Sequence, residues 1–291
     1  MEMTHTYMNF AQEKKHIDVL SLFLRFITSL AALLTAMVVV FLIGYIFIKG
    51  VRHLSPELFS LTYTSGNCSM LPAMVNTVVM VIITLLISVP LGVGAAIYMT
   101  EYARRGSRLV RIVRTAAETL QGVPSIVYGL FGMLFFVTAL KWRYSLLAGA
   151  CTLAMMVLPL IMRTTEEALR SVPDSYREGS FGLGAGRLRT VFRIVLPSAV
   201  PGILAGVILG IGRIVGESAA LIFTAGTVAE VATSLGDSAR TLSVHMYALS
   251  CEGLHIDQTY ATAVVLLVLV IAINALSDLI AGKLGGGSKN G

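Results

Sequence analysis

The chain has 291 residues, of which 56% are hydrophobic and only 13% are charged. This composition excludes an ordinary soluble globular protein. The formal net charge of +6 does not indicate nucleic-acid binding, because the basic residues cluster beside long apolar runs, as they do in membrane proteins.

Six apolar runs are long enough to cross a bilayer as helices, which takes about 20 residues. The sequence therefore predicts an all-α integral membrane protein, with a polar lead at residues 1–18, a six-span domain at residues 19–282 and a short tail at residues 283–291. Gly122 and Pro124 predict an irregular start for the third span. The expected spans cover residues 20–48, 72–100, 118–140, 144–162, 201–224 and 259–280.

Most lysine and arginine residues fall on one side of this arrangement, in the lead, the tail and the segments 101–115 and 163–199. The positive-inside rule makes these segments cytoplasmic, so both termini are expected inside. The loops 49–71 and 225–258 are then outside. The first apolar run is too long for a signal-peptide core, so no cleavable leader is expected.

The three cysteines form no CxxC or His/Cys cluster, so no metal site is expected. Cys68 and Cys251 both fall in predicted outer loops, and a disulfide between them remains open at this stage. His245 and His255 lie in the second outer loop without metal-ligand spacing, and we interpret them as surface or packing residues.

The fifth span carries two charges near its middle, Arg213 and Glu217. They are four residues apart, so a continuous helix would place them on one face. Gly202, Gly206 and Gly210 repeat at the same spacing, and such a stripe lets a neighbouring helix approach closely. The charges should therefore face protein or water rather than lipid. They form either a structural pair that locks two helices, or an anion site or gate in which Arg213 binds the ion.

The expected cytoplasmic loop at residues 163–199 has the pattern of two helices joined by a turn. Pro173 and Asp174 favour a helix start, and Gly184 is a candidate for the left-handed residue that ends this helix. A second amphipathic helix follows, and Pro197 is expected to end it. The loop is either an interfacial connector that binds anionic membrane lipid or a docking element for a cytoplasmic partner.

The spacing in this loop resembles the EAA motif of ABC-importer permeases, with Gly and Ser in place of the usual alanines. The resemblance implies a type I importer permease (MetI-like) fold with its core at residues 72–282. The loop would then be a coupling helix seated on an ATPase subunit. The residues that match the motif are Glu178, Gly184, Ile194, Leu196 and Pro197.

Three further stretches, at residues 122–132, 212–226 and 240–249, resemble the phosphate-specific subgroup of this family. The resemblance implies a permease subunit of a phosphate importer in the bacterial inner membrane, with Arg213 and Glu217 in the path of inorganic phosphate. Its implied partners are a homologous second permease, two ATPase subunits and an extracytoplasmic phosphate-binding protein. A guanidinium suits this role because its fork of donors matches phosphate oxygens.

The sequence contains no GxxxxGK(S/T), HExxH or GxSxG motif. The chain is therefore not expected to be an enzyme or to bind a cofactor, and ATP and Mg²⁺ would be used by the partner ATPase. One alternative is a permease for another oxyanion, such as molybdate, sulfate or phosphonate. Another is a secondary transporter, which would need no EAA loop, or an intramembrane enzyme, which would need a convergent polar cluster in the spans.

Overall fold

The computed structural model describes residues 19–104 and 106–285, so the predicted lead, Arg105 and the end of the tail lie outside the described residues. Within the described part the secondary structure is helical, without strands. The chain divides into two units, residues 1–48 and 49–291, and each is described by itself. The first unit contains most of α1 (Val19–Val51), an unbroken apolar helix of 33 residues that is long enough to cross a membrane.

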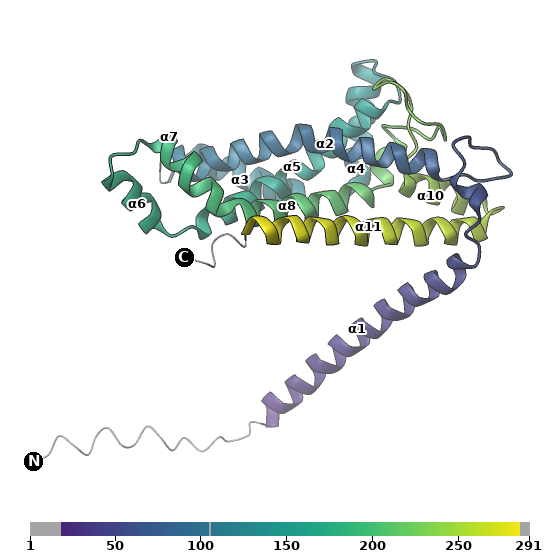
Figure 1. The fold of residues 1–291 in the computed structure, drawn as a ribbon, viewed down its shortest axis with the longest axis horizontal. Coiled ribbons are helices and arrows are strands. Elements are labelled where there is room, and N and C mark those ends of the chain that lie inside the picture. The colour runs from purple at the N-terminus through teal and green to yellow at the C-terminus, as the bar shows by residue number, and fades with distance from the viewer. Residues whose placement is uncertain (1–18, 105, 286–291) are drawn as a thin grey trace, which may run out of the picture. The chain divides into compact units, whose positions relative to one another are not determined.

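The second unit is a bundle of helices. Figure 1 shows α2, α5, α8 and α11 running in a common direction, with α6 and α7 at one end of the bundle and α10 at the other. These ends are called the α6 end and the α10 end below. The helices and helical turns are η1 (Pro56–Phe59), α2 (Leu71–Ile97), η2 (Tyr98–Tyr102), α3 (Arg108–Gln121), α4 (Ser125–Gly132), η3 (Met133–Ala139), α5 (Leu146–Ser171), α6 (Asp174–Gly182), α7 (Arg187–Thr190), η4 (Val191–Val195), α8 (Leu196–Val215), α9 (Ala219–Ile222), α10 (Leu242–Glu252) and α11 (Ile256–Gly285).

Helix α5 is the centre of this bundle, because it packs against both α2 and α8 and is the most buried of the membrane-length helices. Leu153, Met156 and Ile161 on α5 are fully buried. Small residues on the neighbouring helices allow this close approach: a Cβ added at Gly92 of α2 would lie 3.0 Å from the Ile161 side chain.

Five described helices are long and apolar enough to cross a membrane, and there are six if α3 and the α4–η3 pair count as one bent span. The chain bends by 104° between α3 and the segment formed by α4 and η3, and the bend follows Gly122. The hydroxyl of Tyr128 donates to the carbonyl of Leu120 at 2.9 Å, and the N–H of Val123 donates to the same carbonyl at 3.1 Å, so the end of α3 at the break is satisfied. The predicted irregularity is confirmed, but the sequence placed residues 108–115 in a loop, and they are helical.

The predicted fifth span is not one helix. Helix α8 ends at Val215, and the short helix α9 begins only at Ala219. At the other end, Pro197 does not end the preceding helix, as the sequence analysis expected. The chain continues from α7 through η4 into α8, because η4 is a widened π-helical turn in which the N–H of Leu196 donates to the carbonyl of Val191, five residues back. The ring of Pro197 would clash with a regular helical turn before it, and the widened turn of η4 allows the helix to continue through this proline.

Two other predicted loops contain helix. Helix α5 continues to Ser171, beyond the predicted end of the fourth span at residue 162, and an i,i+4 ion pair between Arg163 and Glu167 supports its last turns. The second predicted outer loop contains α10, which ends at Gly253 in the left-handed conformation, with φ +69°.

The glycine stripe of α8 faces α5. A Cβ at Gly202 would lie 2.7 Å from Ala168, and one at Gly206 would overlap the side chain of Thr164. Gly210 has more room, with the nearest atom of Val157 at 3.3 Å. The stripe therefore sets how closely α8 and α5 pack.

We expect Gly206→Val to lower the thermal unfolding midpoint of the detergent-solubilised protein, because overpacking against Thr164 costs about 1–3 kcal/mol. Gly212→Val is the matched control on the same helix, since no atom lies within 4 Å of the added Cβ. Equal midpoints for the two variants would contradict the close α5–α8 contact.

Candidate functional site

Two broken helices meet in the second unit. The break between α3 and α4 follows Gly122, and the break between α8 and α9 follows Val215. Helix α4 packs on α9 so closely that a Cβ at Gly129 would lie 2.8 Å from the Cα of Ala220. Irregular backbone within a membrane protein is stable only where it is buried or lines a water-filled cavity, and broken helices often form transport sites.

Arg213 lies in the last turn of α8, beside this junction. Its side chain is half-buried, and in the described part of the chain it has neither a hydrogen bond nor an ion pair. The free carbonyl groups at the C-terminal end of α8 stabilise a cation at this position. Tyr128 of α4 lies close enough to Arg213 for an electrostatic interaction. The guanidinium therefore keeps its donors available at the meeting point of two broken helices.

Glu217 lies in the break itself and is only 9% exposed. Its Oε1 accepts a hydrogen bond from the N–H of Ala220 at 3.1 Å, so the carboxylate caps the start of α9. The expected pairing of Arg213 with Glu217 on one helix face is therefore wrong. Helix α8 ends between the two residues, and the helical spacing rule does not extend across that end.

The first turn of α10 is bonded to the same break, and this turn and the preceding loop are bonded to α2. The hydroxyl of Ser243, in the first turn of α10, donates to the carbonyl of Glu217 at 2.5 Å. The N–H of Leu242 donates to Thr77 of α2 at 2.8 Å, and the side chain of Asn76 donates to the carbonyl of Glu230, also at 2.8 Å. Sequence reasoning missed Asn76 and Thr77, although two adjacent polar residues early in an apolar span were a signal.

His245 is fully buried in α10 and is a packing residue rather than a surface residue. The Arg240 guanidinium lies 3.4 Å from its Nδ1 and can only donate, so Nδ1 is the acceptor in this contact. The ring of Tyr63 packs against both residues. Burial, and then the charge of Arg240, lower the pKa of His245 from 6.5 to about 4.

This lowered pKa predicts that the fold loses stability in acid. The unfolded chain takes up a proton near pH 6.5 and the folded chain only near pH 4, so stability falls by up to about 1.4 kcal/mol per pH unit between these values. Thermal unfolding at pH 7 and pH 4.5 tests this. His245→Gln should weaken the pH dependence, because it removes this titrating group. An unchanged dependence in His245→Gln would contradict the assignment.

The cysteines of the two predicted outer loops are not joined. Cys68 is buried and Cys251 is exposed, and both are free thiols. The disulfide that the sequence left open is therefore absent from the described structure.

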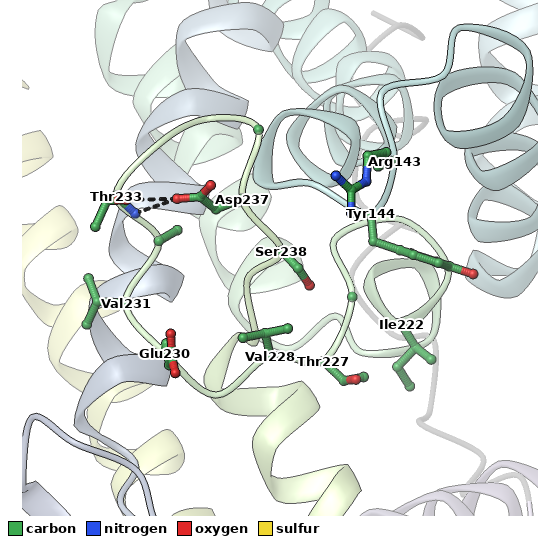
Figure 2. Close-up of a pocket in the computed structure, with 13 residues that line it drawn as sticks. Arg143, Tyr144, Ile222, Thr227, Val228, Glu230, Val231, Thr233, Asp237 and Ser238 are labelled. Carbon is green, nitrogen blue, oxygen red and sulfur yellow. Dashed lines mark hydrogen bonds between the residues drawn. The ribbon is translucent and has the colours of Figure 1, made fainter.

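A pocket of about 880 Å³ lies under the loop between α9 and α10. Figure 2 shows Asp237 bonded to Thr233 on one side of this pocket and Arg143 and Tyr144 on the other. Hydrogen bonds from Thr233 and Ser234 lower the pKa of Asp237. The pocket includes Ile222 of α9 and so adjoins the helix that Glu217 caps, but the carboxylate of Asp237 is already satisfied by the loop.

The α6 end carries the residues of the EAA-like motif. Helix α6 ends as the sequence predicted, with Gly184 left-handed at φ +81°. Glu178 and Pro197 are exposed, whereas Ile194 and Leu196 are half-buried. Large apolar side chains are exposed around them, so this end presents an unpartnered apolar surface: Tyr176, Phe181, Leu183, Leu188 and Phe192.

One residue of α6 that the sequence analysis did not select is Arg177. Its side chain is 14% exposed and forms an ion pair with Glu101, at the end of η2, with 2.7 Å between Nη2 and Oε1. The sequence gives no signal for Arg177, because it is one of several arginines in a basic loop and no pattern distinguishes it from its neighbours.

The fold, with membrane-length helices around α5 and a helix pair protruding at one end, is that of an ABC importer permease. Two solved ABC transporters contain a chain with a similar fold. One imports alginate, with TM-score 0.64 and 17% identity, and the match covers 91% of this chain and 99% of that chain. The other is the MetNI methionine transporter, with TM-score 0.58 and 20% identity, covering 83% of this chain and 97% of that chain.

The chain belongs to the family described as binding-protein-dependent transport system inner membrane component, whose model matches residues 88–286. It is 38% identical to the probable ABC transporter permease protein YqgI of Bacillus subtilis, over 77% of this chain and 81% of that protein. It is 34% identical to the phosphate transport system permease protein PstA of Yersinia pestis, over 81% of both chains. The protein is thus a multi-pass, non-catalytic permease subunit of the inner membrane.

Proposed function

We propose that this chain is a permease subunit of an ATP-driven phosphate importer and that phosphate passes Arg213. The observation that carries this proposal is the half-buried guanidinium, which has no hydrogen bond or ion pair among the described residues and lies where two broken helices meet. The relatives named as phosphate permeases support the choice of ion.

The chemistry of Arg213 suits transient anion binding. A guanidinium presents several donors in a planar fork, which matches the oxygens of phosphate. A single half-buried cation binds an anion weakly, and a transport path needs weak binding so that the ion can leave. Glu217 does not compete for the arginine, because its carboxylate is engaged with the start of α9. Its proposed role is to hold the break in place beside the path.

The proposed assembly follows from the two ends of the bundle. The α6 end, within the basic loop 163–199, is cytoplasmic and docks on one of two ATPase subunits, which use ATP and Mg²⁺. Both termini are cytoplasmic, and residues 19–282 form the six-span domain. The loops 49–71 and 225–258 face outward and receive a phosphate-binding protein. A homologous second permease completes the path. The basic residues of the α6 end and the exposed apolar side chains there support this orientation.

Phosphate uptake by cells that lack other phosphate importers tests the role of Arg213. We expect Arg213→Ala to lower uptake roughly tenfold or more, because hydrogen bonds to charged groups contribute about 1.5–3 kcal/mol. Arg213→Lys should retain part of the activity, and basal ATP hydrolysis should remain in both variants. Arg108→Ala, at an exposed position of α3, is the control.

Normal uptake in Arg213→Ala would overturn the role of this residue. Uptake of molybdate, sulfate or phosphonate in place of phosphate by the wild type would favour the alternative of another oxyanion.

The cytoplasmic docking surface is tested at Leu183, which is 91% exposed and so can be changed without disturbing the packing of this chain. We expect Leu183→Ser to reduce copurification of the ATPase subunits, because it removes apolar area from the contact. Leu254→Ser is the matched control, since Leu254 is 82% exposed at the α10 end. An equal effect of both changes would contradict docking at the α6 end.

A further inference from the structure

Helix α6 has few side-chain bonds to the rest of the described structure. The hydroxyls of Ser180 and Thr190 lie 2.8 Å apart and join α6 to α7. In the part of the chain that the structure describes, every other side-chain hydrogen bond from α6 to the remaining bundle comes from Arg177. In the described structure α6 is therefore joined to α5 by the two intervening residues Val172 and Pro173, whereas its side-chain hydrogen bonds to η2, at the end of α2, come from Arg177.

Arg177 uses its guanidinium to join three segments. Nη2 donates to Glu101 at 2.7 Å and to the carbonyl of Leu169 at 2.8 Å, and Nε donates to Glu101 at 3.2 Å. Nη1 donates to the carbonyl of Val172 at 2.7 Å and lies 3.3 Å from Asp174. The side chain thus holds α6 to the end of α2 through Glu101 and to the last turn of α5 through two carbonyls.

The ion pair between Arg177 and Glu101 is shielded from water and has a well-defined geometry. The side chains of Arg177 and Glu101 are 14% and 9% exposed, so water screens the pair little. The geometry is a fork over a carboxylate, which fixes both distance and orientation. Glu101 belongs to η2, a π-helical turn at the end of α2, and such turns occur often at functional positions.

The surroundings of the pair are open. A pocket of about 380 Å³ lies beside it, lined by residues of η2, α5, α6 and α7, including Thr100, Arg170 and Phe181. The ion pair therefore joins α6 to η2 at the edge of this pocket.

We propose that Arg177 is a positioning residue that transmits the movement of α6 to α2 and α5 through Glu101. This inference rests on the proposed function, because it takes α6 as the element that the ATPase subunits move. The Arg177–Glu101 pair converts a displacement of α6 into a displacement of two spans.

The test uses the assembled transporter in proteoliposomes with Glu101→Gln, Arg177→Gln and the double variant. Glu101→Gln is the mild change, since Arg177 keeps its carbonyl acceptors. We expect Glu101→Gln to retain the ATPase subunits and basal ATP hydrolysis, while phosphate imported per ATP falls roughly tenfold, within the usual range of coupling between sites. The double variant should be no worse than Arg177→Gln, because both residues act through one contact.

The exposed pair Arg163–Glu167 of α5 provides the matched control, with Arg163→Gln and Glu167→Gln expected to leave the import ratio unchanged. An unchanged import ratio in Glu101→Gln would overturn the proposal. Loss of the ATPase subunits from that variant would also overturn it, because the pair would then have only a structural role.

A second readout does not depend on phosphate. Cys251 is an exposed free thiol on α10, so a dye attached there in a Cys151→Ser background reports movement at the α10 end on addition of ATP. The response should be present in the wild type and lost in Glu101→Gln, and its persistence in Glu101→Gln would overturn the inference. A wild type that responds to ATP but imports no phosphate would instead overturn the proposed function and leave the role of Arg177 intact.

Discussion

The structure depends on one constraint: a backbone that leaves its helix inside a membrane protein must find other hydrogen-bond partners, because no bulk water is available. Both breaks at the candidate site meet this requirement with nearby side chains. Tyr128 adds a hydrogen bond to a carbonyl at the end of α3, and Glu217 caps α9 while its own carbonyl accepts from Ser243. These bonds explain how the short helices α4 and α9 can follow the breaks in the chain beside Arg213.

The same bonds join the site to the α10 end. Ser243 belongs to a segment that is also held by Thr77 of α2, and that segment continues to His245. His245 is buried and, because its pKa is lowered, it is neutral near pH 7. Its uncharged ring packs against Arg240 and Tyr63. The start of α10 therefore contacts the backbone of Glu217 directly, through the hydroxyl of Ser243.

At the α6 end, Arg177 forms a polar contact between α6 and the end of α2. Helix α6 presents exposed apolar residues, and an ion pair with little exposure to water joins it to the end of α2. A contact of this kind has a defined geometry, which suits an element that we propose to move together with the bundle. The two ends thus use directional polar contacts, whereas α5 is held by close apolar packing against glycines of α2 and α8.

The sequence by itself determined the fold class, the approximate spans, the glycine stripe of α8 and the left-handed turn at Gly184, because apolar length and glycine spacing are local properties. Only the tertiary structure decided where helices break and what the charges contact. The separation of Arg213 from Glu217 depends on a cap at Ala220 and a bond from Ser243, and the importance of Arg177 depends on Glu101, 76 residues away in the chain. Contacts between residues so distant in sequence leave no periodicity that a pattern can reveal.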